Sequence, residues 1–108
     1  MTQGKKTRPA GPAVRAILNV LKEHYQSAHP EAVIDCYRQN SASIRIRILD
    51  PGFRDLNRAT RDDQIWKILG NLPEDIQSQI TVLLLLTPEE AKTSFANMDF
   101  ENPIPSRL

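Results

Sequence analysis

The sequence of 108 residues contains one cysteine, no long apolar run and almost no net charge. A single cysteine rules out an intramolecular disulfide framework and a CxxC-type zinc site. No apolar run approaches the ~18–20 residues that cross a bilayer, so we expect no membrane contact. A net charge of +1 gives no overall field to attract nucleic acid or an anionic surface. Together these absences favour a cytoplasmic protein in a reducing compartment.

Residues arranged for catalysis are also lacking. No Ser-His-Asp or Cys-His order with a supporting motif occurs. His24 and His29 stand five positions apart, so a helix would turn them to different faces, and no third metal ligand lies nearby. Asp62 and Asp63 suit the first turn of a helix, where the dipole favours negative charge. We therefore predict a protein that is not an enzyme and has no metal ligands and no cofactor.

The two ends of the chain are polar and the middle is apolar, which indicates one domain. Residues 1–11 combine three basic side chains with glycine and proline, and no apolar segment follows that would make a signal peptide. Residues 98–108 contain Pro103 and Pro105. We predict a flexible basic tail over residues 1–11, a folded domain over residues 12–97 and a flexible tail over residues 98–108.

The first half of the domain reads as a helix followed by a β-hairpin. Apolar residues recur at helical spacing over residues 13 to about 27, and the His-Pro pair at 29–30 ends the helix. Two alternating segments, residues 32–38 and 43–48, flank the turn residues 39–42. We expect helices to cover only one side of this hairpin. The side chains expected to face the core are Ala32, Ile34, Cys36, Ile44, Ile46 and Ile48.

The second half adds a helix, a strand and a last helix. An Asp-Pro-Gly turn at residues 50–52 precedes a helix with Thr60 as its expected N-cap and Gly70 at its end. The apolar face of this helix is predicted to be Ile65, Trp66, Ile68 and Leu69. One more helical turn over residues 73–78 leads to an apolar strand over residues 80–86, which we expect to be covered on both faces.

A capping box, Thr-Pro-Glu-Glu at residues 87–90, begins a helix expected to end at about residue 95 or 97. The predicted order is α-β-β-α-(α)-β-α. It specifies an α+β fold, a small two-layer α/β sandwich with a three-stranded sheet.

This order resembles that of the BolA family, whose fold is a KH-like α/β sandwich. The resemblance covers residues 14–91 and rests on residues 46–53, on Arg61 with residues 65–69, and on residues 83–90. BolA proteins have a strand ending near a Phe-Gly segment, an Arg-His-Arg helix start and a strand ending in Thr-Pro-Glu-Glu. The resemblance implies a divergent BolA/class II KH-like protein that acts as a non-enzymatic interaction or regulatory module.

Two differences from the family concern its iron–sulfur site. The histidine that the resemblance implies as a ligand of a cluster shared with a monothiol glutaredoxin falls at Asp62. The loop that supplies a second ligand in many members is shortened to about residues 39–42. We therefore carry over no metal ligand, and a monothiol glutaredoxin stays the candidate protein partner.

The predicted partner-binding surface is a groove between the loop of residues 50–57 and the helix that bears Trp66. Its expected contact residues are Phe53, Arg61 and Trp66. Trp66 also suits the interior, since aromatic residues on an apolar helix face are commonly core residues. Cys36 falls on the core face of its strand, and we interpret it as a structural residue because free cysteine is often buried.

The alternative function is weak nucleic-acid binding by a KH-like domain, through the outward strand face of Arg45 and Arg47 together with Lys67. A KH domain grips nucleic acid with a Gly-x-x-Gly loop between two helices. Here the corresponding residues 70–73 read Gly-Asn-Leu-Pro, and the proline removes a backbone N–H. We expect little binding at physiological salt.

Overall fold

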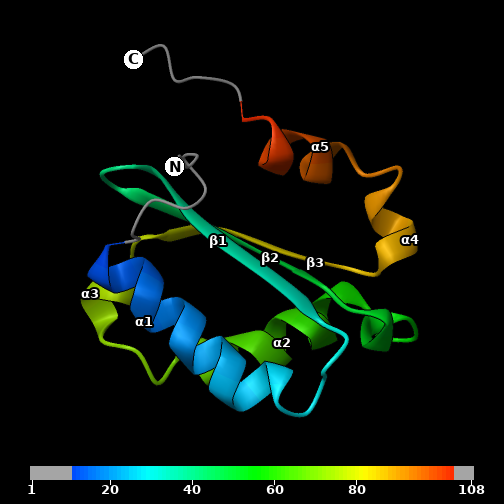
Figure 1. Cartoon of the computed structure of the whole chain (residues 1–108), viewed down its shortest axis with the longest axis horizontal. Coiled ribbons are helices and arrows are strands. Elements are labelled where there is room, and N and C mark those ends of the chain that lie inside the picture. The colour runs from blue at the N-terminus through cyan, green and yellow to red at the C-terminus, as the bar shows by residue number, and fades with distance from the viewer. Residues whose placement is uncertain (1–10, 104–108) are drawn as a thin grey trace, which may run out of the picture.

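A three-stranded sheet lies between a large helical layer and a small one in the computed structural model, which describes residues 11–103. In Figure 1, α1, α2 and α3 lie on one side of the sheet, and α4 leads to α5 on the other side. The predicted α+β class and three-stranded sheet are confirmed, and the predicted element order is confirmed up to the start of α4. The elements are α1 (Pro12–Leu21), a π-helical turn (Lys22–Gln26), β1 (Val33–Asn40), β2 (Ser43–Leu49), a 3-10 turn (Pro51–Phe53), α2 (Arg58–Leu69), α3 (Glu74–Gln77), β3 (Ile80–Leu86), α4 (Pro88–Ala91) and α5 (Phe95–Glu101).

The central strand, β2, pairs with both neighbours. It runs antiparallel to β1, with Cys36 opposite Ile46, and parallel to β3, with Ile46 opposite Leu83. The hairpin was expected from the turn residues, and the crossover through α2 and α3 provides the length that a parallel pair requires. The strands are close to the predicted ranges, and β3 matches its range of residues 80–86.

The main core forms between β2 and the first two helices. Ile44, Ile46 and Ile48 have no solvent exposure, and each such side chain contributes about 1.5–3 kcal/mol by its burial. Helix α1 buries Ile17 and Leu21 at the spacing of one turn. Residues of α1 and α2 therefore cover the inner face of the sheet, as the alternation of β2 predicts.

Helix α2 begins earlier than predicted. Its N-cap is Asn57, whose Oδ1 accepts a hydrogen bond from the Thr60 N–H at 2.9 Å, so Thr60 is not the cap. Asparagine is as good an N-cap as threonine, and Asn57 precedes Thr60 in the chain, so capping by Asn57 gives the longer helix. Asp62 and Asp63 consequently fall beyond the first turn. Gly70 caps the end as predicted, with a right-handed φ of −64°.

The C-terminal part contains two short helices where one was predicted. The capping box of Thr87 and Glu90 is confirmed, but α4 ends at Ala91. Ser94 then caps α5 by accepting a hydrogen bond from the Asn97 N–H at 3.0 Å. The domain boundary predicted after residue 97 is wrong, because it falls inside α5 and Phe100 beyond it is buried. The remaining parts of the predicted tails, residues 1–10 and 104–108, lie outside the described residues.

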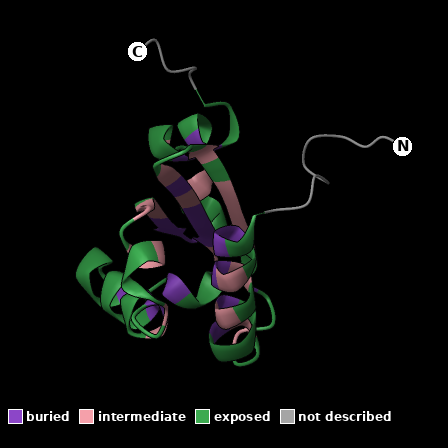
Figure 2. Ribbon diagram, turned by 90° about the vertical axis from the view of Figure 1, so that its left-hand side faces the viewer, coloured by how far each residue is buried: buried purple, intermediate pink, exposed green. Residues whose placement is uncertain are grey.

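The outer face of the sheet carries a second apolar cluster. Leu84, Leu86 and Phe100 are buried there, with Tyr37 and Leu49 packed against them. Figure 2 shows α5 beside the end of the strands, on the side away from α1. The expectation that helices cover only one side of the hairpin is therefore wrong, whereas β3 is covered on both faces as predicted.

Within residues 11–103, no helix is long and apolar enough to span a bilayer.

Candidate functional site

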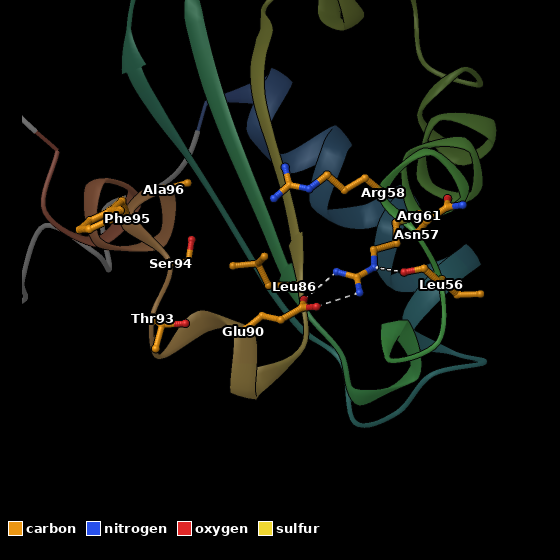
Figure 3. Close-up of a pocket in the computed structure, with 10 residues that line it drawn as sticks. All are labelled: Leu56, Asn57, Arg58, Arg61, Leu86, Glu90, Thr93, Ser94, Phe95 and Ala96. Atoms are coloured by element: carbon orange, nitrogen blue, oxygen red, sulfur yellow. Dashed lines mark hydrogen bonds and ion pairs between the residues drawn. The ribbon is translucent and has the colours of Figure 1, made fainter.

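An open groove of about 560 Å³ separates the start of α2 from α4 and α5. Figure 3 shows its residues on both sides of Leu86, which comes from the end of β3. The groove shares residues 56–57 with the predicted partner-binding loop, and its other wall was not predicted. Its lining residues are Leu56, Asn57, Arg58, Arg61, Leu86, Glu90, Thr93, Ser94, Phe95 and Ala96.

Arg61 forms the base of the groove and is fully engaged. Its Nη1 and Nη2 atoms donate to the two carboxylate oxygens of Glu90 at 2.7 and 3.1 Å. Its remaining N–H groups donate to the backbone carbonyls of residues 53, 56 and 85, each at 2.9 Å. A guanidinium has five N–H donors, so none is left for a ligand. The hydrogen bond from Arg61 is the main reason that the pKa of Glu90 falls to about 2.

Phe53 is fully buried, so it offers no contact surface to a partner. Its ring lies under the Arg61 guanidinium, 5.4 Å from ring centroid to Cζ, and 6.0 Å from the ring of Tyr25. The space predicted as a groove between its loop and α2 is filled by this ring. Phe53 and Arg61 are therefore parts of the scaffold that fix the loop against α2.

Trp66 is 37% exposed on α2 and does not line the groove. It is thus not the core residue that the apolar face of the helix suggested. The three residues predicted to bind a partner are not brought together on one surface: two are buried and one is exposed elsewhere. Residues 65 and 69 form the buried side of the helix.

Sequence reasoning missed two exposed residues of the groove. Phe95 is 84% exposed, at the first position of α5. Arg58 is exposed at the start of α2, and its guanidinium has no hydrogen bond or ion pair within residues 11–103. The sequence signal near Phe95 is Ser94, a residue type that commonly caps the start of a helix, but it does not show which side chains of that helix are exposed. No local signal marked Arg58.

The arginines of the predicted nucleic-acid face are not free. Arg47 is buried, and its guanidinium contacts Asp35 at 2.6 Å and Glu101 at 2.7 Å. Burial alone would lower the pKa of Arg47, and the hydrogen bonds to these carboxylates raise it above its usual value. Arg45 pairs with Asp99 at 3.0 Å. Lys67 lies on α2, in the layer on the opposite side of the sheet, so the predicted trio does not form one patch.

The remaining titratable candidates have structural surroundings. Cys36 is half-buried against the main core, and burial is the main cause that raises its pKa to about 12. His29 stacks on Tyr25 with 4.2 Å between ring centroids, and its Nδ1 lies 3.4 Å from Asp50 Oδ2. His29 is therefore held against Tyr25 and Asp50, whereas His24 is exposed, and the two histidines do not share a site. Among residues 11–103, no three His, Cys, Asp or Glu side chains are grouped to hold a metal.

Comparisons with family models and with curated proteins find no match. Among solved structures, BolA1 from Arabidopsis thaliana matches with a TM-score of 0.48 and 17% sequence identity, over 74% of this chain and 96% of that chain. Its name is that of the family that the sequence motifs resemble. At this identity and score the match carries no argument about the activity, partner or site residues of this chain. The assignment of the α+β class rests on the topology described above.

Proposed function

We propose that the protein is a non-enzymatic interaction module that binds a segment of a protein partner in the groove between α2 and the α4–α5 segment. The observation that carries the proposal is Phe95, a large apolar side chain that lines the groove while 84% exposed. Burying such a ring gains roughly 1.5–3 kcal/mol, and aromatic residues are enriched among the residues that dominate interfaces.

The charge of the groove specifies the chemistry of that segment. Arg58 carries a positive charge without a described partner, and the start of α2 adds the positive end of a helix dipole. Glu90 does not offset this charge, since both its oxygens are held by Arg61. The complementary occupant is an acidic segment that places an apolar side chain against Phe95 and a carboxylate against Arg58.

The resemblance of the motifs to BolA proteins makes a monothiol glutaredoxin the first partner to test. Asp62 stands where the family's histidine is implied, so we expect docking of the two proteins without a shared cluster. The alternative of nucleic-acid binding through Arg45 and Arg47 has less support in this arrangement, because both guanidinium groups already pair with carboxylates.

The test compares two double variants of the full chain. Arg58→Glu with Phe95→Ser alters the groove, and Lys67→Glu with Met98→Ser makes the same chemical changes at exposed positions outside it. We expect the groove variant to lose roughly tenfold or more in affinity for the partner, and the control to bind like the wild type. Affinity is measured by calorimetry with apo monothiol glutaredoxin and with any protein recovered from the native lysate. Equal binding of the two variants would refute the groove as the binding site.

A further inference from the structure

Helix α5 is attached to the sheet mainly through charged and polar side chains. It has seven residues, and a helix this short is not stable on its own in water. Only Phe100 of α5 belongs to the buried apolar cluster, while Phe95 and Met98 are exposed. Its position on the outer face therefore depends on the partners that its polar side chains find there.

Four residues of α5 make these contacts. Asn97 Oδ1 accepts a hydrogen bond from Arg47 Nη1 at 2.7 Å, and residues 99–101 make the others, including a hydrogen bond of 2.8 Å from the Tyr37 hydroxyl to the Phe100 backbone oxygen. Asp99 pairs with Arg45, with 3.0 Å between Oδ2 and Nη1, and Glu101 pairs with Arg47, with 2.7 Å between Oε2 and Nη1. Between them in sequence, the Phe100 ring lies 4.9 Å from the Arg47 guanidinium and 4.9 Å from the ring of Tyr37. The segment thus presents a carboxylate, an aromatic ring and a second carboxylate to two arginines and a tyrosine.

The arginines are not fully satisfied by α5. The Nε atoms of Arg45 and Arg47 are buried, and neither has a hydrogen-bond partner within residues 11–103. A buried N–H without an acceptor is unfavourable, and native structures contain few of them. The two arginines therefore have more N–H donors than the acceptor atoms that α5 supplies. A ligand with more acceptor oxygens at each anionic group would match this site better.

We propose that α5 is a displaceable latch over an anion-binding face, and that the ligand it imitates is single-stranded nucleic acid. Phosphate groups would replace Asp99 and Glu101 on Arg45 and Arg47, since each phosphate brings several acceptors to a guanidinium. A base would take the place of the Phe100 ring against Tyr37 and Arg47, where stacking is independent of base identity. A duplex does not fit this role, because its bases are paired and stacked inside it.

The arrangement of the strand supports a single-stranded ligand. Arg45 and Arg47 are two positions apart on β2, so they point to the same face at a separation of roughly 6.6 Å along the strand. Asp35 stays on Arg47 when α5 leaves, because it belongs to β1. The gain in positive charge therefore comes mainly from Arg45. The closed latch also explains why little binding is expected from the wild type.

The experiment weakens the latch without touching the arginines. Asp99→Asn with Glu101→Gln removes two negative charges from α5, and Asp55→Asn with Asp75→Asn removes two from exposed positions elsewhere. A fluorescent single-stranded oligouridylate of about ten nucleotides is the probe, and anisotropy measures its binding. We expect the latch variant to bind roughly tenfold more tightly than the wild type, and the control pair to gain much less. Amide exchange of α5 is measured on the same samples and should become faster in the latch variant alone.

A third change locates the binding face. Adding Arg45→Gln to the latch variant should return the affinity to the wild-type level and lower the salt slope by about one. Arg45 is chosen because Arg47 is buried and its replacement endangers folding. Phe95 belongs to α5, so release of α5 also alters the groove, but Arg45 does not line the groove. A gain in oligouridylate binding that Arg45→Gln removes therefore locates the binding on the outer sheet face and not in the groove.

Three results would overturn the proposal. If amide exchange of α5 stays slow in the latch variant, the ion pairs do not hold the helix. If α5 is released and the oligouridylate binds no better than to the control pair, the uncovered face is not a nucleic-acid site. If a peptide of residues 94–102 binds the released face and the oligouridylate does not, the face recognises an acidic aromatic protein segment instead.

Discussion

Replacement of Arg61 by methionine should destabilise the fold more than any other single arginine change in the groove. The side chain joins four segments: its guanidinium donates to carbonyls of the 3-10 turn, of Leu56 in the loop before α2 and of β3, and to Glu90 of α4. Methionine keeps the apolar stem over Phe53 but supplies no donor. The Phe53 and Leu85 carbonyls would then lose a buried hydrogen bond, and Glu90 would lose its counterion.

The expected loss in free energy of unfolding is about 3–5 kcal/mol, the cost of removing one partner from a buried ion pair. A domain of this size has about 5–15 kcal/mol in total. With an m-value of about 1.5 kcal/mol/M, the urea midpoint should fall by about 2–3 M. Urea unfolding followed by circular dichroism measures this shift. The control is Arg58→Met, an exposed neighbour whose replacement should change stability by less than about 0.5 kcal/mol. A loss below about 1 kcal/mol for Arg61→Met would refute this reasoning.

The same ion pair predicts a pH dependence. The pKa of Glu90 falls from its usual 4.5 to about 2, first because of the Arg61 hydrogen bond and then because of the Thr87 backbone. A carboxyl with a lowered pKa in the folded state stabilises the fold above its unfolded pKa, and this contribution is lost as the pH falls toward 2. The side chain is 44% exposed, so screening by solvent reduces the effect. Wild type should lose more stability than Arg61→Met between pH 4.5 and 2.

Three further predictions concern single side chains. Cys36 should react slowly with a thiol reagent in the native state and fast in denaturant, because burial raises its pKa to about 12; rapid native labelling would contradict its position. Tyr25→Phe should cost about 1–3 kcal/mol, since Asp50 loses a hydrogen bond of 2.5 Å. Burial, and then Asp50, raises the pKa of Tyr25, so stability should fall as the pH rises above 10 in wild type and less in the variant, as alkaline unfolding curves would show. Asp62 is a poor ligand for an iron–sulfur cluster. Adding the protein to cluster-loaded monothiol glutaredoxin should therefore leave the absorption and circular dichroism spectra of the glutaredoxin unchanged. A spectral change that Asp62→Ala or Cys36→Ala removes would instead indicate that this protein ligates the cluster.

The elements that the sequence predicted well have local causes. Alternation along β2 places Ile44, Ile46 and Ile48 on one face, and that face is the main core. The capping box at Thr87 begins α4 and the glycine at position 70 ends α2, and both act through hydrogen bonds to residues three or four positions away. Where two local signals competed, as Asn57 and Thr60 did for the start of α2, the sequence alone gave no reason to prefer the first.

The candidate site was predicted only in part, since it forms where distant segments meet. The groove joins residues 56–61 to residues 93–96, and only packing of α4 and α5 creates its second wall. Arg61 and Phe53 were predicted to be surface residues because arginine and loop aromatic residues are often exposed. The local sequence does not show that carbonyls of distant segments accept hydrogen bonds from the Arg61 guanidinium.

The sequence by itself determined the strands, the first helices and the inner core, because hydrophobic period and capping act within a few residues. Tertiary structure decided whether the outer sheet face is exposed or covered. Alternation correctly turned Arg45 and Arg47 away from the inner core, but whether that face meets water or another segment depends on where the chain returns. It returns as α5, and Asp99 and Glu101 meet the two arginines across more than fifty residues of sequence.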